Sequence, residues 1–258
     1  MDVNLEEKNA LVCGSSQGIG KAVAIELAKL GASVTLLARN QAALSEVAQE
    51  LDTAIGQQHG VLVADFNDFN SVKEIVATDN QYHILVNNTG GPAGGMAIDA
   101  DTDAYINAFN SHLLNNQILA QAVTPFMKAQ GYGRIINIIS TSVKVPIKGL
   151  GVSNTIRGAV ANWSKTLANE LGSFGITVNN VLPGATSTAR LSAIIQNKSS
   201  KTGKSITEVE QELKSEIPAG RFASAAEIAS AVAFLATPAA AYINGINVPV
   251  DGGRTGCL

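Results

Sequence analysis

Cysteine and long apolar runs are scarce in this chain, and each scarcity excludes a class of protein. The 258 residues include two cysteines, Cys13 and Cys257, which rules out a disulfide-stapled scaffold. The start of the chain lacks the charged-then-apolar pattern of a secretory signal, so we expect a reducing, cytoplasmic setting. The most apolar stretch, 228–243, contains Pro238 and falls short of the roughly 20 residues that a spanning helix requires, so we expect no membrane segment.

An excess of either charge is absent as well. Lysine and arginine total 18, aspartate and glutamate total 21, and the two signs are interspersed. A basic face for nucleic acid or for an anionic membrane is therefore not expected. The sequence shows no internal repeat and no break in composition, and 258 residues of which 46% are hydrophobic suffice for one core. We predict a single domain over residues 1–258, with no nucleic-acid partner and no metal site.

Apolar runs rich in β-branched residues alternate with segments whose apolar residues recur at helical spacing. The predicted strands are 10–13, 33–38, 60–64, 84–87, 134–139, 176–182 and 246–250. The predicted helices are one that begins near Ile19, then 41–55, 69–78, 102–129, 150–174 and 225–236. Such an alternation is typical of an α/β fold, here a Rossmann-type doubly wound parallel sheet. The most polar stretch, 197–203, is expected to be a mobile loop.

The turn between the first strand and the first helix is rich in glycine. Glycine permits a sharp turn and a close approach of the backbone, and a helix N-terminus presents N–H groups and a positive dipole end. We interpret this turn as the site of a dinucleotide pyrophosphate. A structural tight turn would look similar, and the position directly after the first strand favours binding. The turn consists of Gly14, Ser15, Ser16, Gln17, Gly18, Ile19 and Gly20.

Further motifs follow in a fixed order along the chain. They are Asn87-Asn88-Thr89-Gly90, Pro183-Gly184 and Val250-Asp251-Gly252-Gly253. With the glycine turn they resemble the short-chain dehydrogenase/reductase family, and in particular its 3-oxoacyl-acyl-carrier-protein reductases, over essentially the whole chain. The resemblance implies that Asp65 accepts a hydrogen bond from the adenine amino group and that Thr188 touches the nicotinamide carboxamide. The full set of cofactor positions that it adds is Asp65, Phe66, Asn87, Gly90, Pro183, Gly184 and Thr188.

The end of the second predicted strand bears on the choice of cofactor. In dinucleotide-binding folds an acidic residue there binds the ribose 2′-hydroxyl of NAD, whereas an arginine can hold the 2′-phosphate of NADP. Arg39 stands at this position, and its planar, permanent cation suits a phosphate. We therefore favour NADP(H) over NAD(H), although a solvated charge at the end of a strand would explain Arg39 too.

The catalytic residues of the family are only partly present. By the resemblance, the family's Asn, Ser, Tyr and Lys positions fall on His112, Ser140, Ser153 and Arg157. No tyrosine in the chain is followed four residues later by lysine. The four-residue spacing still places Ser153 and Arg157 on one helical face. The sequence thus predicts an altered active site on a retained scaffold.

Loss of the tyrosine changes the chemistry that is available. A tyrosine, with a pKa of about 10, can exchange a proton near neutrality when a cation lies beside it, whereas a serine hydroxyl cannot. Ser140 and Ser153 can hydrogen-bond a carbonyl. Arg157 can hold the nicotinamide ribose but cannot relay a proton. The proton would come from His112, from Lys148 or from water, and an ordinary structural role stays open for both side chains.

The segment from Ser187 to Gly220 matches the loop and helices that cover the substrate in the family. Three of its lysines, Lys198, Lys201 and Lys204, lie close together and would suit an anionic substrate tail, but the glutamates that follow are equally consistent with a solvated charged helix.

We expect an NADP(H)-dependent oxidoreductase acting on a small carbonyl or alcohol. The alternatives are a catalytically silent NADP(H)-binding sensor or partner subunit, or a lyase or isomerase that reuses the pocket. The predicted helices 102–129 and 150–174 resemble the family's dimer face, which implies a homodimer or homotetramer.

Overall fold

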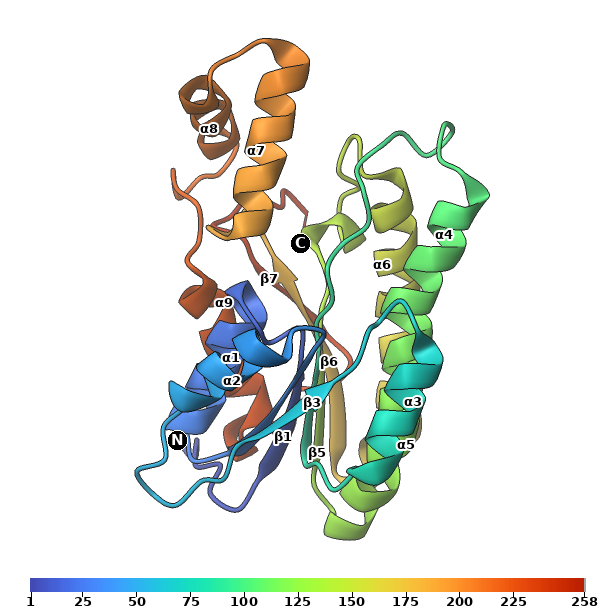
Figure 1. Ribbon diagram of the computed structural model, residues 1–258, viewed down its shortest axis with the longest axis vertical. Helices are drawn as coiled ribbons and strands as arrows, with labels where there is room; N and C mark the ends of the chain where they lie inside the picture. The colour runs from blue at the N-terminus through green and yellow to red at the C-terminus, as the bar shows by residue number, and fades with distance from the viewer. Residues whose placement is uncertain (258) are drawn as a thin grey trace.

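A parallel β-sheet forms the centre of the computed structural model, which describes residues 1–257 (Figure 1). The strands of this part are β1 (Asn9–Cys13), β2 (Ser33–Ala38), β3 (Gly60–Val63), β4 (Ile84–Asn87), β5 (Gly133–Ile138), β6 (Ile176–Pro183) and β7 (Asn247–Val250). They pair in the order β3-β2-β1-β4-β5-β6-β7, and every pair is parallel. The predicted doubly wound sheet is confirmed. The order reverses between β1 and β4, and such sheets bind ligands outside the carboxyl ends of the strands at this point.

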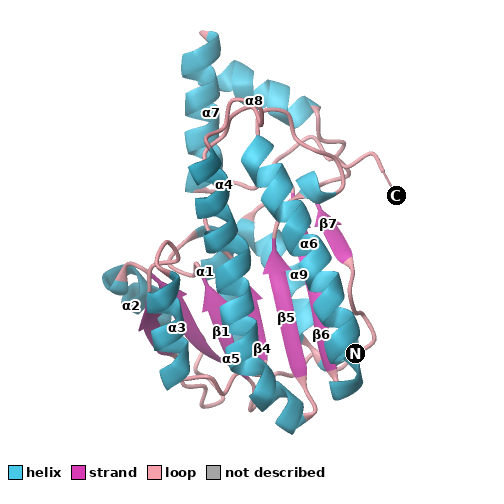
Figure 2. Cartoon of the chain, turned by 90° about the vertical axis from the view of Figure 1, so that its right-hand side faces the viewer, coloured by secondary structure: helices cyan, strands magenta, loops and turns pink. Residues whose placement is uncertain are grey.

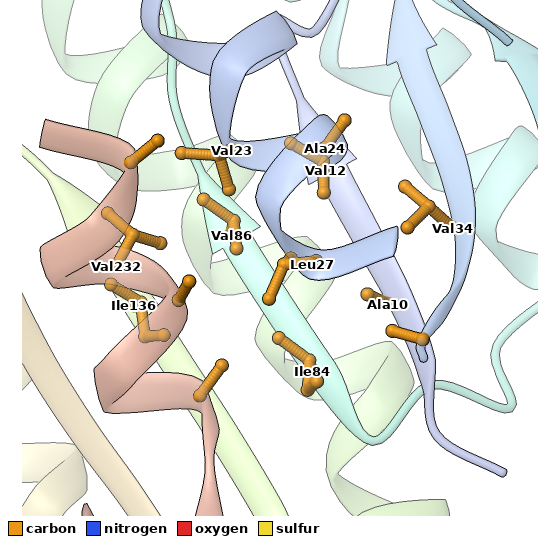
Figure 3. Close-up of a cluster of buried hydrophobic side chains, with 14 of the residues drawn as sticks. Ala10, Val12, Val23, Ala24, Leu27, Val34, Ile84, Val86, Ile136 and Val232 are labelled. Atoms are coloured by element: carbon orange, nitrogen blue, oxygen red, sulfur yellow. The ribbon is translucent and has the colours of Figure 1, made fainter. Parts of the chain in front are cut away.

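Helices cover both faces of the sheet. One face carries α1 (Gly18–Lys29), α2 (Gln41–Gln49) and α9 (Ala225–Ala236), and the other carries α3 (Phe69–Thr78), α5 (Asn115–Gln130) and α6 (Gly151–Leu171) (Figure 1). Successive side chains of a strand point to opposite faces. In β1, Ala10 and Val12 therefore join the core beneath α1 and α9, where Val232 also packs (Figure 3), and Leu11 and Cys13 join the core beneath α3 and α5. Burial on both faces explains why the strands are continuous apolar runs.

Two helices rise beyond the carboxyl edge of the sheet. α7 (Ala189–Thr202) follows β6, and α8 (Ile206–Ser215) packs against it (Figure 2). This corrects the expectation of a mobile loop at 197–203, because residues 197–202 complete α7 and Gly203 ends it with φ of +72°. The polar composition was misleading because α7, which is described in full, buries Ile195 alone. A helix with so little burial has the composition of a loop.

Two helices end earlier than their periodicity indicated. The helix predicted over 41–55 ends at Gln49. Beyond it the Asp52 side chain accepts a hydrogen bond from the Ala54 amide at 2.8 Å, and such local turns compete with helix. The helix predicted over 150–174 ends as α6 at Leu171, and a 3₁₀ turn follows it.

The helix predicted over 102–129 is interrupted. α4 (Thr102–Phe109) is followed by one π turn, Asn110–Leu114, and then by α5. The backbone N–H of Asn115 accordingly donates to the backbone carbonyl of Asn110, five residues back. A π turn inside a helix frequently marks a functional site, and this one carries His112.

Membrane spans and metal clusters were also searched for among residues 1–257. None of their helices is both long enough and apolar enough to cross a membrane. The same residues include no group of three His, Cys, Asp or Glu side chains placed to hold a metal ion.

Candidate cofactor and active site

The glycine turn between β1 and α1 is hydrogen-bonded to the loop after β4 and packs closely against it. The Asn88 side chain donates to the carbonyls of Cys13 at 3.3 Å and of Gly14 at 3.2 Å. A Cβ on Gly14 would lie 2.5 Å from the Asn88 carbonyl, and a Cβ on Gly20 would lie 2.2 Å from the Gly14 carbonyl. Gly14 also has φ of +59°, in the left-handed region that glycine tolerates. Only glycine therefore lets these loops pack, and the packing fixes the N-terminus of α1.

The first turn of α1 offers free backbone donors. Its N-cap residue, Gln17, forms no side-chain capping bond, so the first N–H groups of the helix lack that acceptor. Ser15, by contrast, is fully buried, and its Oγ accepts a hydrogen bond from the Leu37 amide at 3.0 Å. Its side chain ties the turn to β2. Free amides at the positive end of a helix dipole, beside glycines that leave room for a ligand, fit a dinucleotide pyrophosphate.

The positions expected at the adenosine half lie at the ends of β2 and β3. Arg39 is exposed, and within residues 1–257 it forms no ion pair. One oxygen of Asp65 accepts from the Asn67 amide at 2.9 Å and from its side chain at 3.0 Å, which leaves the other oxygen for a ligand. Asn115 on α5, which the sequence analysis missed, donates to the Phe66 carbonyl at 2.6 Å. Asn115 thus holds the loop that carries the expected adenine contact.

Asn87 ends β4 with one polar atom unpaired. Its Nδ2 donates to Asn137 Oδ1 at 2.8 Å, whereas its own Oδ1 is buried with no hydrogen-bond partner in residues 1–257. A buried acceptor of this kind normally has a reason. It is compatible with the cofactor contact that the resemblance implies for Asn87, and we call this end of β4, Asn87–Gly90, the expected cofactor wall. Gly90, just beyond, is exposed, and no atom lies within 4 Å of where its Cβ would stand, so the space in front of this wall is open.

The last predicted cofactor positions meet the glycine turn from β6. Thr188 caps α7, and its Cγ2 lies 3.5 Å from where a Cβ on Gly18 would stand. Pro183 ends β6, and a Cβ on Gly184 would lie 2.7 Å from Asp251 Cα. The structure therefore brings the glycine turn, the Asn87–Gly90 loop and the start of α7 to one edge of the sheet.

His112 is buried in the π turn between α4 and α5. Its Nδ1 contacts Thr89 Oγ1 in the loop after β4. Burial, and then the cations Arg157 and Arg190, lower the pKa of the imidazole to about 3. The ring is therefore neutral at physiological pH, and it does not carry the additional proton that an imidazolium donor needs.

Arg157 points into the protein from α6, one turn after Ser153. It is 8% exposed, and its Nη1 donates to the Ile138 carbonyl at the end of β5 at 3.1 Å. Burial, and then the neighbouring Arg190, lower the pKa of its guanidinium to about 10. Arg157 thus remains a cation at neutral pH. Ser153 is partly exposed on the same helix face.

Ser140 and Lys148 lie on the chain between β5 and α6. Ser140 caps the short turn after β5, where its Oγ accepts from the Ser142 amide at 3.1 Å. This leaves the hydroxyl proton of Ser140 free to be donated. Lys148 is exposed, and no hydrogen bond or ion pair within residues 1–257 directs its ammonium group toward the serines.

Two of the three clustered lysines of the covering segment, Lys198 and Lys204, form ion pairs within that segment. Lys198 contacts Glu212 at 3.3 Å, and Lys204 contacts the same carboxylate. These contacts favour the interpretation as a solvated charged helix over that of a site for an anionic tail.

Known proteins are similar to this chain in sequence and in fold. A family model described as enoyl-(acyl carrier protein) reductase matches residues 14–255. The 3-oxoacyl-[acyl-carrier-protein] reductase FabG of Pseudomonas aeruginosa is 34% identical over 256 residues, which are 97% of this chain and 98% of FabG. The solved L-sorbose reductase of Gluconobacter frateurii, complexed with NADPH and L-sorbose, is 30% identical with a TM-score of 0.93, over 100% of both chains. YwfH, an NADPH-dependent reductase involved in bacilysin biosynthesis, is 29% identical with a TM-score of 0.92, over 98% of this chain and 100% of YwfH.

The sheet and its glycine-lined edge define a Rossmann-type α/β protein. The similarity over almost the whole chain goes one step further. The chain belongs to the short-chain dehydrogenase/reductase family, as the order of its motifs predicted.

Proposed function

We propose that this protein is an NADP(H)-dependent oxidoreductase that moves hydride between the nicotinamide and a small carbonyl or alcohol substrate. The observation that carries the proposal is the glycine-lined edge of the sheet, where the glycine turn, Asn88 and Thr188 converge. Arg39, exposed and without an ion pair in residues 1–257, supports NADP(H), because a guanidinium binds a phosphate well. The similar L-sorbose reductase was solved with NADPH, which agrees with this choice.

The side chains at the carboxyl edge have distinct roles in the proposed reduction. When bound, the reduced nicotinamide supplies a hydride to the carbonyl carbon. Ser140 and Ser153 donate hydrogen bonds to the carbonyl oxygen, and Arg157 holds the ribose hydroxyls with donors that its bond to Ile138 leaves free. Water delivers the proton that completes the alcohol. His112, being neutral, orients the loop after β4 through Thr89 and is not the proton donor.

A second candidate is a catalytically silent NADP(H)-binding sensor or partner subunit. The observation that favours it is Ser153, because a serine hydroxyl at this position cannot give up a proton as a tyrosine does. A fluorescence titration with NADPH, followed by assays of NADPH consumption, separates the two. The carbonyl panel should include ketones, sugars, oxo acids and a 3-oxoacyl thioester. Turnover of any member supports the enzyme, binding without turnover supports the sensor, and absence of binding contradicts both.

We also propose that the protein is a homodimer or homotetramer. α4 packs on α6 and leaves Ile106 and Phe109 exposed, at 56% and 43%. Exposed apolar side chains on neighbouring turns are typical of a surface that a second copy covers. Light scattering at micromolar concentration should give a dimer or tetramer, and a monomer would contradict the proposal.

A further inference from the structure

Two arginines converge on the loop that follows β4. If Gly91 carried a Cβ, that atom would lie 3.5 Å from Arg190 Nη2 and 3.9 Å from Arg157 Nη2. Both guanidinium groups are anchored by carbonyls. Arg190 Nη2 donates a hydrogen bond to the Pro92 carbonyl at 2.9 Å. Arg157 donates to the Ile138 carbonyl through its other terminal nitrogen, Nη1. Each arginine therefore presents donors to the same small space beside Gly91.

Neither cation is neutralised within residues 1–257. Arg221 and Arg254 form ion pairs with Glu227 and Glu216, whereas no carboxylate of these residues pairs with Arg157 or Arg190. Arg157 is also buried, and a buried charge without a counter-charge is costly. The neighbouring like charge increases that cost. An anion bound between the two guanidinium groups would remove it.

The position of this pair relates it to the proposed chemistry. Gly91 directly follows the Asn87–Gly90 loop at the carboxyl end of β4. Ile138, the anchor of Arg157, lies two residues before Ser140. The space between the arginines is thus adjacent to the point where the proposed function places the reacting carbonyl.

We propose that Arg157 and Arg190 form a carboxylate site, and that the carbonyl substrate of this protein is an oxo acid held there by its carboxylate. This inference rests on the proposed function for the identity of the carbonyl group. The family's lysine would offer one nitrogen at position 157. Arginine offers two terminal nitrogens and several N–H donors, so that Nη1 keeps the bond to β5, Nη2 turns to the anion, and further donors remain for the ribose hydroxyls. Planar guanidinium groups match the two oxygens of a carboxylate.

Direct binding of oxalate, a small dicarboxylate, tests the site. We expect saturable binding in calorimetric titrations of the native protein, with and without saturating NADP⁺. Arg190→Gln should weaken oxalate binding about tenfold or more, the loss expected when a charge-assisted hydrogen bond is removed. Lys201→Gln is the matched control, because it removes one charge from an exposed position on the same helix that forms no ion pair with the described residues. It should leave the affinity unchanged.

Substitutions at Gly91 test the same space without removing an arginine. Gly91→Asp places a carboxylate between the guanidinium groups and should abolish oxalate binding. Gly91→Ala is its control, because its Cβ would make ordinary contacts with both arginines and the glycine has no positive φ that an L residue would strain. Because that Cβ takes up part of the space beside Gly91 but adds no charge, the alanine variant should weaken oxalate binding much less than Gly91→Asp.

The outcomes separate this inference from the proposed function. Absence of oxalate binding, or equal binding by native protein and Arg190→Gln, overturns the carboxylate site. A tenfold loss of NADPH affinity in Arg190→Gln with oxalate binding unchanged also overturns it, because Arg190 would then serve the cofactor phosphates. If NADPH fails to bind at all, the proposed function fails, while the titration without cofactor still decides whether the arginines hold an anion.

Discussion

The side-chain nitrogen of Asn87 donates to the side-chain oxygen of Asn137 at 2.8 Å, and this bond begins a row of amides across the sheet. Asn137 donates to Asn180 at 3.0 Å, and Asn180 donates to Asn247 at 2.8 Å. The parallel register sets the four residues side by side on β4, β5, β6 and β7. The expected cofactor wall on β4 is therefore braced against the last strand of the sheet.

Removal of the second amide in this row should destabilise the fold. Asn137→Ala leaves the Asn87 amide group without its acceptor and both Asn180 and Ser164 without a donor. An unsatisfied buried polar group costs about 1–3 kcal/mol, so we expect the free energy of unfolding in urea to fall by on the order of 3 kcal/mol. Asn107→Ala, at an exposed position of α4, is the control and should change it by less than about 0.5 kcal/mol. Equal stability of the two variants would contradict a structural role for the row.

Glycine at position 20 should be indispensable for cofactor binding. A Cβ there would lie 2.2 Å from the Gly14 carbonyl, so Gly20→Ala must push the glycine turn away from α1. We expect at least a tenfold loss of NADPH affinity in fluorescence titrations, together with a lower melting temperature. In contrast, Gly158→Ala in α6 meets no atom within 4 Å, and alanine favours helix by about 1 kcal/mol, so this control should be at least as stable as the native protein. Unchanged NADPH binding by Gly20→Ala would refute our account of the turn.

Arg39 should determine the preference for NADPH over NADH. Arg39→Ala should cost about 1.5–3 kcal/mol of NADPH binding, the range for a hydrogen bond to a charged group. Affinity for NADH, which lacks the 2′-phosphate, should be unchanged and serves as the internal control. Native protein that binds both cofactors equally well would show that Arg39 is only a solvated charge at the end of β2.

His112 should make stability depend on pH in acid. Its pKa is lowered to about 3 in the folded protein, against about 6.5 when unfolded, so only the unfolded chain takes up the proton between these values. The contribution of His112 is therefore complete above pH 6.5 and is lost as the pH falls, by about 1.4 kcal/mol per pH unit.

Urea unfolding of native protein and His112→Asn across this range measures that slope. Asparagine is the residue that the family resemblance places here, and it does not titrate. The native protein should lose stability faster than the variant below pH 6.5, whereas their difference should be constant above it. Parallel curves throughout would mean that the folded protein binds the proton as readily as the unfolded chain.

The strands, most helices and the cofactor motifs were predictable because each depends on neighbouring residues. The glycine turn, for example, is continuous in sequence from Gly14 to Gly20. The asparagine row was not predictable, because it requires the register of strands that are distant in sequence. Arg190 escaped notice for the same reason. It approaches Arg157 only because β6 delivers the start of α7 to the loop after β4.

Restoring the family residues should reveal whether the altered site still performs hydride transfer. Ser153→Tyr combined with Arg157→Lys supplies a phenol with a neighbouring lysine, one helical turn apart on α6. The two changes belong together, because the lysine lowers the pKa of the phenol and has no proton to relay without it. General acid catalysis is typically worth about 10² to 10⁴ in rate, so the double variant should consume NADPH faster by that order at saturating carbonyl. Because Arg157→Lys also removes one arm of the proposed carboxylate site, the KM for an oxo acid should rise at the same time.

The same comparison distinguishes the enzyme from the sensor. Circular dichroism and NADPH titration establish that the double variant folds and binds cofactor, and Ser153→Ala provides a variant with no hydroxyl at position 153. If the site reduces carbonyls with water as the proton source, Ser153→Ala should slow the reaction, because one hydrogen bond to the carbonyl oxygen is lost, and the double variant should accelerate it. A folded, NADPH-binding double variant that is inactive on every carbonyl of the panel would mean that the pocket no longer positions a substrate against the nicotinamide. The silent NADP(H)-binding function would then be the better account of Ser153 and Arg157.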